Sequence, residues 1–158
     1  MKISLSALAL GLAFAFGAPA MAGNTANVSQ NGVDNDATIT QVYNDYALSS
    51  IEQHGNDNTA KTEQKYNDGY TSSKITQWGS GNVAKVSQVN DNYHTSSTIY
   101  QGGSDNLAKV DQSDGGNLSS FIAQGGADNV AKVTQTNWNQ SAVTTQFGWG
   151  NVSKISQK

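Results

Sequence analysis

A six-fold repeat constrains the fold of this chain more than any other feature of its sequence. Each copy contains two glutamines eleven residues apart, and these pairs account for twelve of the thirteen glutamines. The first column is Gln30, Gln53, Gln77, Gln101, Gln124 and Gln146, and the second is Gln41, Gln64, Gln88, Gln112, Gln135 and Gln157. A fixed period of 22 to 24 residues indicates a repeat architecture rather than a disordered chain.

Two further columns divide each copy into strand, turn and strand. Glycine follows the first Gln by two residues, at Gly32, Gly55, Gly79, Gly103, Gly126 and Gly148. Asparagine follows it by five residues, at Asn35, Asn58, Asn82, Asn106, Asn129 and Asn151. On both sides of this Gly–Asn segment, amide, Ala and β-branched positions alternate with polar ones, which is typical of strands. The glycines are expected to supply the positive φ of the turn.

These columns predict an all-β fold, a β-solenoid with two parallel sheets about 10 Å apart and rungs about 4.8 Å apart. The repeats are expected at about 24–41, 47–64, 71–88, 95–112, 118–135 and 140–157. Identical amides one rung apart can each donate and accept, so a ladder satisfies itself. No capping unit is evident, and we therefore expect the Gln and Asn columns to carry head-to-tail self-assembly into a filament.

The segments between repeats are expected to be polar turns. Examples are Asn44-Asp45, Asn67-Asp68-Gly69 and 114–117. The tyrosines of these connectors are expected to pack over the turns.

The N-terminus has the pattern of a signal peptide over residues 1–22. Lys2 precedes an apolar stretch from Ile3 to Phe16, and Ala20-Met21-Ala22 resembles a signal-peptidase site. The mature chain is then expected to begin at Gly23 and to be secreted. It contains no cysteine, so disulfides cannot stabilise it.

Composition argues against several functions. The net charge is −3 and all nine basic residues are lysines, which disfavours a dedicated nucleic-acid binder. The two histidines, His54 and His94, lie in no motif with a nucleophile or a set of metal ligands. We therefore expect no enzyme activity, cofactor or metal.

The repeat resembles that of the curlin family, the amyloid subunits of bacterial curli fibres. The motif Q-x-G-x-x-N-x-A-x-x-x-Q occurs over residues 53–64, and the resemblance covers essentially the whole mature chain. It implies a secreted fimbrial subunit at the cell surface that serves biofilm matrix and cell adhesion. It also implies a nucleator subunit, chaperones and an outer-membrane secretion pore as partners. The regular last copy favours the major subunit; the alternatives are a minor, nucleating subunit or a soluble, monomeric β-solenoid binding module.

Outward positions carry two charge patterns. A lysine column consists of Lys61, Lys85, Lys109, Lys132 and Lys154. It is interpreted either as a solvated face or as a stripe that binds anionic matrix polymers. A turn column carries Asp34, Asp57, Asp105 and Asp128, whereas copies three and six carry Gly81 and Gly150. Stacked aspartates repel, so they are expected to act as gatekeepers, and isolated peptides of copies three and six should assemble fastest.

Overall fold

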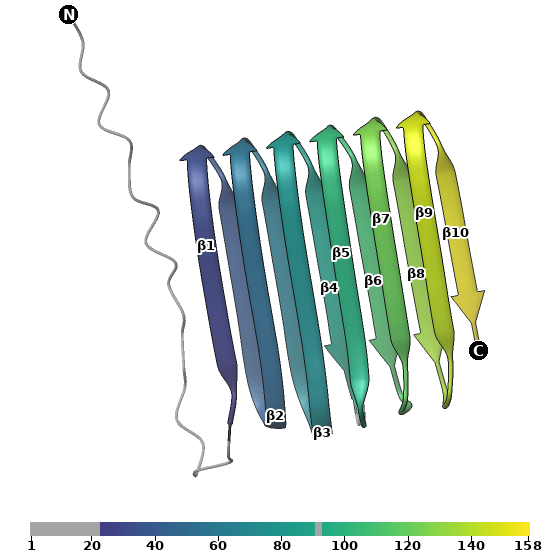
Figure 1. Ribbon diagram of the computed structural model, residues 1–158. Helices are drawn as coiled ribbons and strands as arrows, with labels where there is room; N and C mark the ends of the chain where they lie inside the picture. Colours follow the sequence, from purple (N-terminus) through teal and green to yellow (C-terminus); the bar gives the residue numbers. More distant parts are fainter. Residues whose placement is uncertain (1–22, 91–92) are drawn as a thin grey trace, which may run out of the picture.

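The computed structural model describes residues 23–90 and 93–158, which form ten parallel strands wound into about six coils (Figure 1). The predicted signal peptide lies outside the described residues. The strands are β1 (Thr25–Val33), β2 (Asp36–Asn56), β3 (Thr59–Ser80), β4 (Val83–Val89), β5 (Thr95–Ser104), β6 (Leu107–Ser113), β7 (Ser119–Ala127), β8 (Val130–Thr136), β9 (Ser141–Trp149) and β10 (Val152–Gln157). In the part of the chain described, no helix is long and apolar enough to cross a membrane.

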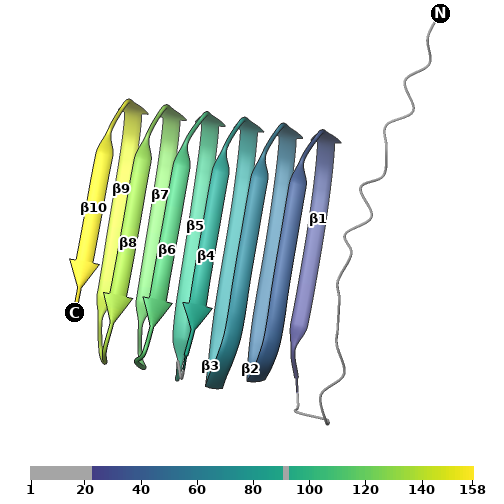
Figure 2. The same cartoon turned by 180° about the vertical axis from the view of Figure 1, so that it is seen from behind.

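The coils stack in register, as the repeat predicts. One face consists of β1, the second halves of β2 and β3, and then β5, β7 and β9. The other face consists of the first halves of β2 and β3, followed by β4, β6, β8 and β10. Figures 1 and 2 show these faces from opposite sides, with β1 at one end of the stack and β9 and β10 at the other. The predicted β-solenoid is confirmed.

The first two connectors differ from the prediction. Asn44-Asp45 and Asn67-Asp68-Gly69 were expected to end the strands, but β2 and β3 continue through both segments. The two connectors pair with each other, with one register shift between Asn44 and Tyr46. Their sequences share Tyr-Asn-Asp, so they can bend together and keep their backbone hydrogen bonds. Because β2 and β3 run through both faces, the two predicted sheets form one continuous ten-stranded sheet.

The core is partly polar. Its apolar part contains isoleucines on one face, such as Ile75 and Ile99, and alanines and valines on the other, such as Ala84 and Val86. The buried Gln and Asn columns lie beside them. The inward-facing alternation also extends toward the start of each first strand, where Ser49, Ser73, Ser97 and Ser120 are buried.

Candidate self-assembly ladders

The two glutamine columns form continuous side-chain ladders along the stack. In the first column each Nε2 donates to Oε1 of the Gln in the following coil, over 2.7 to 2.9 Å. The second column repeats this arrangement at 2.8 to 3.0 Å. All twelve predicted glutamines take part. Such charge-free amide ladders satisfy groups whose burial would otherwise be costly.

Each ladder also holds the backbone of its own coil. Gln77 Nε2 donates to the carbonyl oxygen of Asn82 at 3.0 Å, across the turn. Gln88 Nε2 donates to the carbonyl oxygen of Ser72 at 3.0 Å, so the second column links one face to the other. A single Gln therefore joins neighbouring coils and also fixes the path of the chain within a coil.

The asparagine column has the opposite direction. Asn82 Nδ2 donates to Oδ1 of Asn58 in the preceding coil at 3.1 Å, and the same oxygen accepts the Asn82 backbone N–H at 3.1 Å. The second Nδ2 hydrogen is directed to the following coil, where the Gly103 carbonyl oxygen lies 3.0 Å away. The equivalent side-chain bonds join the remaining members: Asn35, Asn106, Asn129 and Asn151. In the bonds between side-chain amides, glutamines thus donate to the next coil and asparagines to the previous one.

The turn glycines lie where the backbones of successive coils come closest. Gly79 has a φ of +107°, and a Cβ built on it would lie 2.0 Å from the carbonyl oxygen of Gly103. Gly32, Gly55, Gly103 and Gly126 have the same positive φ and the same close contact with the next glycine, while Gly148 shares the positive φ. Only glycine fits these positions. The prediction of a positive-φ turn is confirmed.

The turn aspartates occupy a second left-handed position. Asp34, Asp57, Asp105 and Asp128 have φ between 55° and 57°, and all four are exposed. Gly81 and Gly150 adopt φ of 65° at the same place. A Cβ on Gly81 would lie 2.3 Å from Oδ1 of Asp105, so this carboxylate leans over the glycine. Their gatekeeper role stays a prediction.

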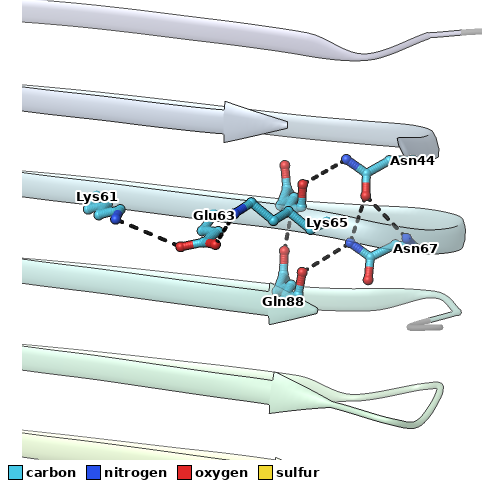
Figure 3. A network of polar contacts seen from close by, with 7 residues as sticks. Asn44, Lys61, Glu63, Lys65, Asn67 and Gln88 are labelled. Carbon is cyan, nitrogen blue, oxygen red and sulfur yellow. Dashed lines mark hydrogen bonds and ion pairs between the residues drawn. The ribbon is translucent and has the colours of Figure 1, made fainter. Parts of the chain in front are cut away.

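A fourth amide column, in the first two connectors, was not predicted. Asn67 Nδ2 donates to Oδ1 of Asn44 at 2.8 Å and to the carbonyl oxygen of Gln88 at 3.0 Å, while Asn44 Nδ2 donates to the carbonyl oxygen of Gln64 at 2.9 Å (Figure 3). Both asparagines are buried. Each lies three residues after the second Gln of its copy, but the later copies have no Asn at that position, so the column has only two members.

The lysine column is exposed on the face that contains β4, β6, β8 and β10, which is called the second face below. Lys61 Nζ lies 3.7 Å from Glu63, and Lys109 Nζ lies 2.8 Å from Asp111, so acidic neighbours offset part of the charge. Glu63 also pairs with Lys65 (Figure 3). The hydrogen bond from Lys65, more than any other contact, lowers the pKa of Glu63 below its usual value.

Within residues 23–90 and 93–158, no group of three His, Cys, Asp or Glu side chains is arranged to hold a metal ion. No family model matches the chain, and no curated protein matches it significantly.

Proposed function

We propose that this chain is a structural subunit of an extracellular, curli-type amyloid fibre that grows by adding whole copies to the end of the stack. In this role the fibre would serve biofilm matrix and adhesion, and the exposed lysine column would bind anionic matrix polymers. The resemblance of the repeat to curlin sequences supports the proposal. The observation that carries it is the complementarity between the first and last coils.

The direction of the ladders makes these two coils complementary. By the rule that holds between all neighbouring coils, Gln146 and Gln157 of one copy would donate to Gln30 and Gln41 of the next. By the opposite rule, Asn35 of the next copy would donate to Asn151. The contact joins two different surfaces, so it does not close and a filament results.

Side chains at such a junction are also compatible. In the same register Gly150 would face Asp34, Val152 would face Asp36, and Lys154 would face Thr38. No like charges are then directly opposite each other, an arrangement that would be repulsive. Exposed apolar surface at the end of the stack, including Trp149 at 82% and Val152 at 77% exposure, would be partly covered.

Sedimentation and fibre diffraction of residues 23–158 test the proposal. We expect the chain to become sedimentable and to give reflections near 4.7 and about 10 Å. A chain that stays monomeric would instead be a binding module, and one that only seeds another subunit would be a nucleator.

A charge pair across the junction gives a sharper test. Gly150→Asp would place a carboxylate opposite Asp34 of the next copy and slow elongation. Asn tolerates the left-handed backbone, so adding Asp34→Asn should restore part of the rate. Residues 34 and 150 lie in the first and last coils of one chain, so coupling between the two changes requires contact between copies. Strictly additive effects would exclude this junction.

A further inference from the structure

Two pairs of tyrosines stack between the first two connectors. The ring centroids of Tyr46 and Tyr70 are 4.8 Å apart, with an angle of 14° between the rings. Those of Tyr43 and Tyr66 are 5.3 Å apart, with an angle of 11°. All four side chains are exposed, from 41% for Tyr46 to 63% for Tyr43. Each pair therefore joins neighbouring coils face to face, within reach of solvent.

The backbone adopts an unfavourable conformation at one of these pairs. Tyr43 and Tyr66 have φ of 53° and 55°, in the left-handed region that bulky residues rarely occupy. The other connectors have residues suited to this conformation at the equivalent position, namely Asn90, Asp114 and Asn137. Tyrosine at a position that favours Asn or Asp points to a use for the aromatic ring.

We propose that these two pairs are sites of oxidative tyrosine cross-linking. A one-electron oxidant, such as a haem peroxidase with hydrogen peroxide, removes one electron and one proton from each phenol. The two phenoxyl radicals then couple through their ortho carbons, and both rings regain aromaticity when the ortho hydrogens shift to the oxygens. One peroxide is reduced to two waters for each C–C bond formed.

Such a bond would be the covalent staple that this cysteine-free chain otherwise lacks. It would join residues 23 or 24 positions apart and so restrict the unfolded chain, as a disulfide does. Both tyrosines of each pair belong to one chain, so the inference does not depend on fibre formation.

Two other tyrosines provide internal controls. Tyr93 stacks on His94 with ring centroids 4.3 Å apart, and Tyr100 lies beside Phe121 at 5.9 Å. Neither has a stacked tyrosine partner among the described residues. They should remain largely unmodified in the folded chain.

The test is peroxidase and hydrogen peroxide treatment of folded residues 23–158, followed by trypsin digestion and mass spectrometry. Cleavage after lysine separates the peptide ending at Lys61, which holds Tyr43 and Tyr46, from peptide 66–74, which holds Tyr66 and Tyr70. We expect these two peptides joined with the loss of two hydrogens for each C–C bond formed, together with dityrosine fluorescence. A mixture of isotopically labelled and unlabelled chains should give unmixed cross-links.

Phenylalanine variants keep the stacked rings and remove the phenol. Tyr46→Phe with Tyr70→Phe should leave only the 43–66 link, and Tyr43→Phe with Tyr66→Phe only the 46–70 link. All four changes together should abolish the product, whereas Tyr93→Phe with Tyr100→Phe should leave its yield unchanged. Linkage spread evenly over all tyrosines, mainly mixed-isotope products, or no linkage would overturn the proposal.

Discussion

The two ends of each coil are built differently, although both reverse the chain. At the turn inside a repeat, glycines stack so closely that a Cβ on Gly55 or Gly79 would lie 2.0 Å from the next carbonyl oxygen. At the connectors between repeats, length and sequence vary, and the buried Asn44–Asn67 bond joins only the first two. The same glycine contact recurs at the turns and sets the spacing of the coils there, whereas the connectors combine backbone hydrogen bonds with side-chain contacts that differ from one connector to the next.

This difference shows where the fold tolerates change. A turn that stacks backbone on backbone requires the same residue in every coil, because one side chain displaces both neighbours. The connectors have no such uniform column, and they contain tyrosines, asparagines or glycines in different copies. The turn therefore sets the register, and the connectors are free to carry other properties.

The largest expected effect comes from adding one methyl group at the turn. Gly79→Ala should lower the free energy of unfolding by about 4 kcal/mol, because it combines a positive φ with a clash against the Gly103 carbonyl. Gly102→Ala is the matched control, since nothing lies within 4 Å of its added Cβ. Urea unfolding measures both. Equal losses of unfolding free energy in Gly79→Ala and Gly102→Ala would mean that the close glycine contact does not constrain the turn.

Removing a ladder amide should have the next largest effect. Gln53→Ala deprives Gln30 and Gln77 of a partner, at about 1–3 kcal/mol for each orphaned group. Lys85→Ala changes only the exposed face and should cost little or even shorten the lag before assembly. Comparable effects of the two variants on stability and lag time would contradict the role of the glutamine ladder.

At the connectors we expect a local effect. Asn67→Ala removes the bonds to Asn44 Oδ1 and to the Gln88 carbonyl, at about 1–3 kcal/mol. Hydrogen exchange should accelerate in the first two connectors while the turn amides keep their protection. Asp68→Ala, an exposed neighbour, is the control. Loss of protection throughout the molecule would show that turn and connector unfold as one unit.

The same difference explains what the sequence could predict. The turn and the two strands of each repeat were predictable because every copy repeats them. The repeat period, the alternation of inward and outward residues, and the Gly and Asn columns all indicate the same strands and turn. The connectors were not predictable, because Asn44 and Asn67 form a column with only two members and polar residues ordinarily indicate exposed turns. Their burial depends on the neighbouring coil, which periodicity within one repeat does not reveal. The stacked tyrosines were missed for the same reason.

Turn charge should affect the rate of assembly more than stability. Asp105→Gly removes repulsion from Asp128 one coil away. It should shorten the lag several-fold, which corresponds to a decrease of about 1 kcal/mol or less in the free-energy barrier to assembly. Gly81→Asp should lengthen it, because the new carboxylate would meet Asp105. A thioflavin time course on the full chain and on the six isolated repeats measures both effects. If neither variant moves the lag, the turn aspartates are not gatekeepers.

The smallest expected effect is a pH dependence on the connector side of the second face. The hydrogen bond from Lys65 lowers the folded-state pKa of Glu63, so this pair stabilises the fold above the unfolded-state pKa. That contribution should be lost as the pH falls from about 4 through the lower folded value. The pair is exposed to solvent, which screens the interaction, so we expect only a small change in stability. Glu63→Gln should remove this part of the pH dependence, while Glu52→Gln, which affects only the bond to His54, should leave it in place. If the pH profiles of the parent chain and Glu63→Gln coincide, the ion pair contributes nothing to stability.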